Sequence, residues 1–389
     1  MTAKSKRILM DGRFVGVGES ISRYTLETLK GILKLDQTNQ YTLLIRPQGE
    51  QALERYPEIV NAPNLKIDIL EIPHYSLAEQ TKLLQYLNKE KYDLVHFTQF
   101  NHPIFYRGDY VTTIHDLTLV GHLHYFNFAK QLAYNMVMKS AARDSKKVIA
   151  ISQTSMDDVI EFFGTPKKKF EIIYHGIDHK NYNAEVKNKK AEIKKFKEKY
   201  GIQGDYILYT GMWKKHKNLV RLFQAFEQFK KDTSNSIQLV LTGKIDKNEP
   251  EVIAEMERVN KSLSSISKNK SSIQTTGFID EEELPIAYAG AQMYVIPSLS
   301  EGFGWPPHEA MACGTPVISS NISCMPEILG DAPYYFDPYN IEDITKAIST
   351  VLGDEKIRKE LAEKGLKQVK KYNWDETAKK TLGVYQSLI

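Results

Sequence analysis

Two glutamates bracket a glycine- and proline-rich run in the last third of the chain. Glu301 stands before the run GFGWPPH, residues 302–308, and Glu309 directly follows it. Glycines let a backbone bend and approach a ligand closely, and a loop that leads into a helix start exposes N–H groups that favour a phosphate. A carboxylate does not contact a phosphate usefully, but it accepts hydrogen bonds from sugar hydroxyls. The pattern therefore predicts an anion flanked by polyols, as in a nucleotide sugar.

The elements around this run must hold it at a strand end. An apolar stretch at 293–296 is typical of a buried strand, and Pro306 and Pro307 suit the start of a helix that Gly314 ends. For either glutamate alone, a capped helix with a solvated acidic first turn is the better interpretation. The two together, around two glycines and two prolines, favour ligand binding.

The chain also opens with a strand, a glycine turn and a helix. The strand at 7–10 runs into a loop that contains Gly16, Val17 and Gly18. This order is the start of a Rossmann-type unit, but the full dinucleotide fingerprint is absent. We expect these three residues to face a ligand cleft rather than to bind a dinucleotide.

A second glycine-ended strand is followed by cations. The strand at 206–209 ends at Gly211, and four basic residues follow before the next helix: Lys214, Lys215, His216 and Lys217. Cations between a strand end and a helix start are well placed for a diphosphate. The alternative is a basic surface loop.

Strands alternate with helices along both halves, which predicts an α/β fold with two Rossmann-like doubly wound domains and a central cleft. The expected domains are residues 1–178, then a connection at 179–205, then 206–372. A last helix at 373–389 has one apolar stripe and is expected to pack back on the first domain. The basic run at 187–199 is interpreted as a solvated helix, with contact to anionic lipid as the alternative.

Composition limits the class of protein. The 389 residues are 42% hydrophobic and 26% charged, with a net charge of +4, too weak to predict nucleic-acid binding. Cys313 and Cys324 are the only cysteines, which favours a reducing cytoplasm. The N-terminus does not read as a signal peptide, and no run has the length of a membrane span. Any contact with an anionic membrane would be peripheral.

The run EGFGWPPHEAMACGTPVI, residues 301–318, resembles the E-x7-E signature of the family 4 retaining glycosyltransferases, whose fold is of the GT-B type. Residues 113–117, TIHDL, resemble the His-Asp motif of mannosyltransferase-like members. Residues 209–211 with 217–219 resemble the diphosphate-binding stretch, and residues 276–279 resemble the segment beside the nucleotide base. The resemblance covers nearly the whole chain.

The resemblance implies roles for individual residues. In the second half, Glu309 would hold the ribose, Glu301 the donor sugar, and Lys217 the leaving diphosphate. The backbone amides of Phe303 and Gly304 would meet the sugar or the diphosphate.

Further roles follow from the same resemblance. His115 would lie near the donor sugar, with Asp116 orienting nearby structure. The resemblance extends donor binding to the glycine loop named above and to a last group: Gly211, Lys214, Gly277, Phe278 and Gly302. Many members carry an arginine where this chain has Met212, so Lys214 or His216 is a candidate for the second cation.

The implied reaction transfers a hexose, with mannose from GDP-mannose favoured, to a hydroxyl of a glycan or lipid-linked acceptor with retention of configuration. No D-x-D triplet is present, so neither a metal nor another cofactor is expected. His115 could instead be the general base of an inverting mechanism. Two other classes stay open: a sugar-nucleotide epimerase and a non-catalytic nucleotide-sugar-binding protein.

Overall fold

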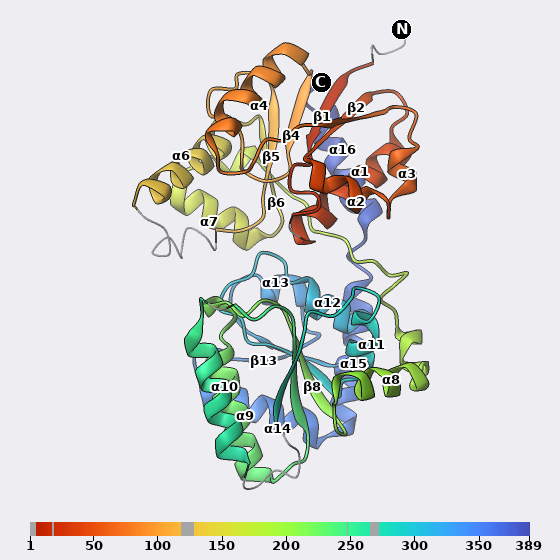
Figure 1. The fold of residues 1–389 in the computed structure, drawn as a ribbon, viewed down its shortest axis with the longest axis vertical. Helices are drawn as coiled ribbons and strands as arrows, with labels where there is room; N and C mark the ends of the chain where they lie inside the picture. Colours follow the sequence, from red (N-terminus) through yellow and green to blue (C-terminus); the bar gives the residue numbers. More distant parts are fainter. Residues whose placement is uncertain (1–4, 18, 118–127, 247, 265–271) are drawn as a thin grey trace. The chain divides into compact units, whose positions relative to one another are not determined.

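A computed structural model describes residues 5–17, 19–117, 128–246, 248–264 and 272–389. The chain divides into two compact units (Figure 1). The first unit contains residues 1–176 and 373–389, and the second contains 177–372. Residues 179–205, predicted as a connection, therefore belong to the second unit. Their helix α8 (Lys190–Tyr200) packs on α11 (Leu284–Gly290) and buries Phe196.

The first unit is built on a parallel sheet with the strand order β3-β2-β1-β4-β5-β6-β7. Its described strands are β1 (Arg7–Asp11), β2 (Gln40–Ile45), β3 (Leu65–Ile69), β4 (Leu94–Phe97), β5 (Tyr110–Ile114), β6 (Lys147–Ala150) and β7 (Phe170–Ile172). The order reverses between β1 and β4. In open α/β sheets, ligands bind outside the carboxyl ends of strands at such a point.

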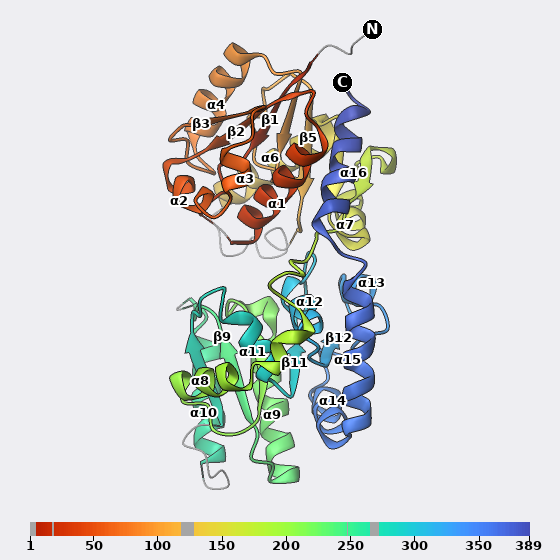
Figure 2. The same ribbon diagram turned by 90° about the vertical axis from the view of Figure 1, so that its right-hand side faces the viewer.

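The helices of the first unit connect these strands. They are α1 (Glu19–Leu35), α2 (Glu50–Leu53), α3 (Pro57–Val60), α4 (Leu77–Glu90), α6 (Phe128–Asp144), α7 (Gln153–Phe163) and the C-terminal α16 (Trp374–Gln386). Helix α16 lies beside α1, although the two are at opposite ends of the chain (Figure 2). The contact is close, because a Cβ on Gly31 would lie 2.4 Å from the Ala378 side chain. The apolar stripe of the last helix thus covers the first unit.

The second unit is built on a parallel sheet with the order β10-β9-β8-β11-β12-β13. Its described strands are β8 (Tyr206–Thr210), β9 (Gln238–Thr242), β10 (Ile273–Gly277), β11 (Met293–Ile296), β12 (Val317–Ser320) and β13 (Tyr334–Phe336). Its remaining helices are α9 (Leu219–Thr233), α10 (Pro250–Leu263), α12 (Trp305–Ala312), α13 (Met325–Leu329), α14 (Ile341–Gly353) and α15 (Glu355–Val369). The order reverses between β8 and β11.

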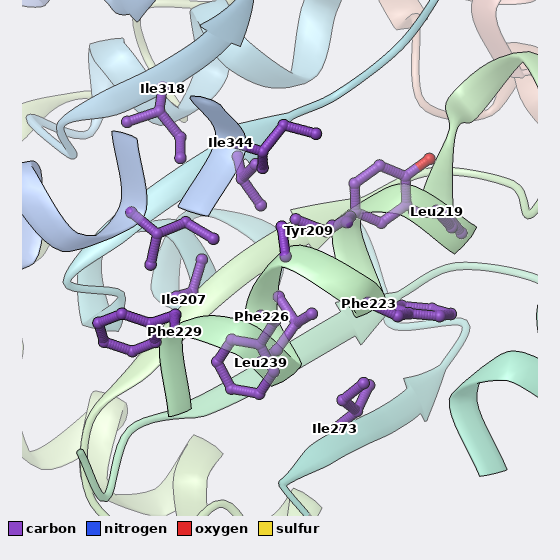
Figure 3. Packing of buried hydrophobic residues seen from close by; sticks show 14 of the residues in the cluster. Ile207, Tyr209, Leu219, Phe223, Phe226, Phe229, Leu239, Ile273, Ile318 and Ile344 are labelled. Atoms are coloured by element: carbon purple, nitrogen blue, oxygen red, sulfur yellow. The ribbon is translucent and has the colours of Figure 1, made fainter. Parts of the chain in front are cut away.

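Apolar side chains of helices and strands form the core of the second unit. Figure 3 shows Phe226 and Phe229 of α9 packed beside Ile207 of β8 and Leu239 of β9. All four are at most 2% exposed. This packing joins α9 to β8 and β9, and the predicted cation loop lies between β8 and α9.

The two doubly wound α/β units that the sequence predicts are confirmed. Within the described residues, no helix combines the length and apolar character needed to cross a membrane.

Candidate functional site

The carboxyl edge of the second sheet carries a buried ion pair at its switch point. Lys217 follows β8 and Glu301 follows β11, and Lys217 Nζ lies 2.6 Å from Glu301 Oε1. The two side chains are only 19% and 13% exposed. The sequence analysis assigned these residues to separate parts of a donor. The structure shows that the two side chains contact each other directly.

Burial alone would raise the pKa of the Glu301 carboxyl. The charge of Lys217, its hydrogen bond and a second one from Ser298 outweigh burial, so the pKa of Glu301 is lowered. The Ser298 hydroxyl donates to the same Oε1 at 2.7 Å. Glu301 is therefore an anion at neutral pH, and an anionic carboxylate is a strong acceptor for sugar hydroxyls.

Two residues after β12 fix the backbone of Glu301. The Ser323 hydroxyl accepts a hydrogen bond from the Glu301 N–H and donates one to its carbonyl, both at 3.1 Å. The Cys324 thiol also lies 3.1 Å from that carbonyl. Ser323 has a φ of +58°, a conformation that is uncommon for a residue with a side chain. Sequence reasoning missed these hydrogen bonds, because they join two loops whose residues are 22 positions apart in the sequence.

The second signature glutamate has a partner that the sequence analysis also missed. Glu309 lies on α12 and is 4% exposed, and its Oε2 accepts a hydrogen bond of 2.8 Å from the Tyr288 hydroxyl. Tyr288 belongs to α11, the helix that precedes β11. The tyrosine orients the carboxylate that the sequence analysis assigned to a ribose.

The glycine run between these glutamates is packed on one side. Gly302 and Phe303 are buried, and the Phe303 ring stacks on His308 with centroids 4.7 Å apart. Gly304 has a φ of +75° and precedes α12, as the sequence predicts for a bend into a helix. The Phe303 side chain therefore anchors the loop, which leaves its predicted ligand role to the backbone.

The predicted cation loop contains a second lysine that is paired with a carboxylate. Lys214 forms an ion pair with Asp246, and a hydrogen bond from Lys214 is the main cause of the lowered pKa of Asp246. Met212, where many family members carry arginine, is 56% exposed. Gly211 has a φ of +149° at the end of β8. The sequence alone did not reveal that Lys214 has a carboxylate partner.

Two more residues of the second unit are predicted to contact the donor, and they lie at the carboxyl end of β10, the strand next to β9. Gly277 closes this strand with a φ of +70°, and Phe278 after it is 64% exposed. An exposed aromatic ring beside a strand end is suited to stacking on a nucleobase.

In the first unit, His115 and Asp116 follow β5 and are both partly exposed. His115 Nε2 lies 2.9 Å from the carbonyl oxygen of Thr98, which can only accept, so Nε2 carries the proton. Burial lowers the pKa of His115, which keeps the ring neutral at pH 7. Its Nδ1 is then an acceptor.

A buried chain of hydrogen bonds stands behind His115. The hydroxyl of Tyr24 bonds to that of Thr113 at 2.8 Å, and Thr113 bonds to His96 Nε2 at 2.8 Å. His96 Nδ1 meets the hydroxyl of Tyr385, on α16, at 2.6 Å. The Tyr24 ring also contacts His115 edge-on, with centroids 5.0 Å apart. The C-terminal helix thus takes part in the wall that holds His115.

The glycine loop of the first unit follows β1. A Cβ on Gly16, which has a φ of +77°, would lie 2.3 Å from the Gln48 carbonyl oxygen, so only glycine fits. Val17 is 50% exposed, and Gly18 lies outside the described residues.

A buried ion cluster stands beneath this loop. The Arg13 guanidinium is 0% exposed and pairs with Asp11 at 2.8 Å and with Glu79 at 3.1 Å. The sequence could have indicated this ion cluster, because Asp11 and Arg13 both lie at the end of β1.

Among the described residues, no three or more His, Cys, Asp or Glu side chains are grouped so as to hold a metal ion. The expected independence from metal stays a prediction.

Comparisons with known proteins give a family match for each half of the chain. A family model described as "Glycosyltransferase Family 4" matches residues 21–181, and one described as "Glycosyl transferases group 1" matches residues 190–368. O-antigen chain mannosyltransferase B of Escherichia coli is 26% identical over 391 residues, covering 95% of this chain and 96% of that protein.

Two further matches are a relative by sequence and a solved structure. Serotype-specific mannosyltransferase WbdA of Escherichia coli is 31% identical over 235 residues, which are 59% of this chain and 27% of that protein. The structure of Anabaena Alr3699/HepE in complex with UDP-glucose superposes with a TM-score of 0.75 at 17% identity, covering 98% of this chain and all of that one. The latter likeness concerns the fold. Together with the two family matches, these findings show that the chain is a glycosyltransferase of family 4 with the GT-B fold.

Proposed function

We propose that this enzyme transfers mannose from a nucleotide sugar, with GDP-mannose favoured, to a hydroxyl of a glycan or lipid-linked acceptor. The observation that carries the proposal is the Lys217–Glu301 pair at the switch point of the second sheet. It combines a cation for a diphosphate with an anionic carboxylate for sugar hydroxyls. Relatives named mannosyltransferases support the choice of sugar.

The proposed reaction exchanges one bond for another. The acceptor oxygen forms a bond to the anomeric carbon while the bond from that carbon to the diphosphate breaks. The diphosphate leaves with the bonding electrons, and Lys217 stabilises the negative charge that develops. With retention of configuration, the acceptor proton passes to the leaving phosphate oxygen on the same face of the sugar.

His115 is proposed to accept a hydrogen bond from a donor sugar hydroxyl through Nδ1. The support is its tautomer, because Nε2 donates to the Thr98 carbonyl and the ring is neutral. A neutral ring with a lowered pKa is a weak base, which favours this role over general-base catalysis in an inverting reaction.

The test begins with a panel of nucleotide sugars. A thermal-shift screen of GDP-mannose, UDP-glucose and related donors should show stabilisation by one of them. Release of GDP or UDP is then measured with an acceptor mixture from the producing cells, with and without a chelator. We expect nucleotide release that the chelator does not change.

The same assay separates the alternatives. Conversion of the donor to an isomer without acceptor would indicate an epimerase. Donor binding without nucleotide release in any acceptor mixture would indicate a binding protein. Abolition of activity by the chelator would contradict the proposed metal independence.

We also propose a cytoplasmic location with, at most, peripheral contact with an anionic membrane. Cys313 and Cys324 are both buried and are not joined in a disulfide, as is usual in a reducing compartment. The basic run at 187–199 is a weak candidate for membrane contact, because Lys194 pairs with Glu198 and Lys199 with Glu283. Sedimentation with anionic vesicles tests this contact, and binding that is equal for neutral vesicles would contradict an electrostatic origin.

A further inference from the structure

The charged residues predicted to bind the donor leave a diphosphate without enough positive charge. In the second unit, Lys217 is balanced by Glu301, and Lys214 is balanced by Asp246. Glu309 adds one more formal negative charge nearby. These five side chains together carry a formal net charge of −1. Bringing an anion into such surroundings is unfavourable unless another cation is present.

The place of that cation in other family members is occupied here by Met212, which is exposed and uncharged. A replacement must lie beside the loop at 211–213. The next strand end provides such a neighbour, because β9 pairs with β8 and ends at Thr242. The residues that follow β9 are Gly243 and Lys244.

The two loops are in direct backbone contact. The Gly211 N–H donates to the Thr242 carbonyl at 3.1 Å, and the Trp213 N–H donates to the Lys244 carbonyl at 3.4 Å. A Cβ on Gly243, which has a φ of +117°, would lie 2.3 Å from the Gly211 carbonyl oxygen. The backbones of Lys244 and Met212 are therefore held next to each other.

The side chain of Lys244 is also available to bind an anion. Its side chain is exposed, and it forms no ion pair with any residue that the structure describes. It differs in this from Lys214 and Lys217, which both have carboxylate partners. A long, flexible ammonium side chain can follow a phosphate as a point charge.

We propose that Lys244 supplies the second cation for the donor diphosphate, in place of the arginine that is absent at Met212. This inference rests on the proposed function, since it requires a nucleoside diphosphate at the carboxyl edge of the second sheet. Lys217 and Lys244 then both meet the phosphate next to the donor sugar, Lys217 beside Glu301 and Lys244 from the side of β9.

The test compares diphosphates with monophosphates, because only the former carry the second phosphate, which Lys244 would meet. Isothermal titration calorimetry measures the binding of GDP, GMP, UDP and UMP to the wild-type protein and to Lys244→Ala. We expect the wild type to prefer one diphosphate over its monophosphate. Lys244→Ala should weaken the diphosphate about tenfold and leave the monophosphate nearly unchanged.

Two further variants complete the test. Lys261→Ala removes the same charge from the exposed last turn of α10, at the other edge of the sheet, and should bind like the wild type. Met212→Arg in the Lys244→Ala background returns a cation to the family position and should restore the diphosphate preference. Thermal unfolding without ligand checks that all variants are folded.

The outcomes separate the inference from the proposed function. A wild-type protein that binds no nucleoside diphosphate overturns the proposed function, and this inference with it. A wild type that prefers a diphosphate, together with a Lys244→Ala variant that keeps the full preference, overturns only the role of Lys244. Failure of Met212→Arg to restore the preference would also overturn it.

Discussion

The two units of this glycosyltransferase place their titratable groups differently. The first buries neutral histidines: His96 and His102 are at most 1% exposed, and burial lowers their pKa values to about 3 and about 4. The second sets the charged pair of Lys217 and Glu301 at the edge of its sheet. Neutral hydrogen-bonding groups suit sugar hydroxyls, and a fixed cation suits a diphosphate. We therefore expect the second unit to recognise the diphosphate, since the Arg13 ion cluster of the first unit is fully buried.

The largest effect is expected from removing the cation of the pair. Lys217→Ala should lower kcat/KM for the donor by about 100- to 1000-fold, because it removes stabilisation of the leaving group and leaves Glu301 without its counter-ion. Steady-state nucleotide release measures this, with Lys261→Ala as the matched control. Turnover like that of the wild type in Lys217→Ala would break the assignment of charge recognition to the second unit.

Acid should destabilise the first unit before the second. The folded pKa values of His96 and His102 lie below the unfolded value of about 6.5, so between pH 6.5 and about 4 the unfolded state binds more protons. Stability therefore falls as the pH decreases through this range, by about 2 kcal/mol per histidine at pH 5. In the second unit, burial lowers the pKa of His308 to about 4.

Limited proteolysis at pH 7 and pH 5, with a protease active at both values, checks this order. New cleavage sites should appear first in residues 5–176 or 373–389. Earlier cleavage within 177–372 would contradict the comparison.

A smaller effect is expected at the C-terminal helix. Tyr385→Phe removes the hydroxyl that meets His96 Nδ1 at 2.6 Å and leaves a buried ring nitrogen unsatisfied. We expect a loss of about 1–3 kcal/mol in the free energy of unfolding, measured by urea denaturation. The affinity for free GDP should stay unchanged, because GDP lacks the donor sugar and its diphosphate is expected to bind the second unit, whereas Tyr385 belongs to the first. Weaker binding of GDP in this variant would show that the division of roles is wrong.

The smallest expected effect concerns His115. His115→Ala removes one proposed hydrogen bond to the donor sugar and should lower kcat/KM about tenfold. The affinity for free GDP should not change, since GDP has no sugar beyond the diphosphate. A loss of GDP binding equal to the loss of activity would contradict the proposed contact.

Local features of the fold could be predicted because neighbouring residues determine them. The cap of the last helix is one such feature, since the Asn373 side chain accepts a hydrogen bond of 2.8 Å from the Glu376 N–H. The prediction that Gly314 follows the end of a helix is confirmed, with a φ of +72° after α12. Both depend on backbone chemistry within a few residues.

Long-range pairings could not be predicted, because one sequence does not show which side chains meet. Lys217 and Glu301 are 84 residues apart, and His96 and Tyr385 are 289 residues apart. The pairing of Lys214 with Asp246 likewise depends on how the loops after β8 and β9 fold together. The resemblance supplied candidate ligand contacts, but the partners that orient them, such as Tyr288 for Glu309, appear only in the structure.

Hydrogen exchange in the presence of donor tests the central claim most directly. Backbone amides of the protein are compared with and without GDP-mannose, with UDP-glucose as the second donor. We predict that one donor protects the loops at 211–218 and 299–309, at the carboxyl edge of the second sheet. A donor that binds yet protects neither loop would contradict the account.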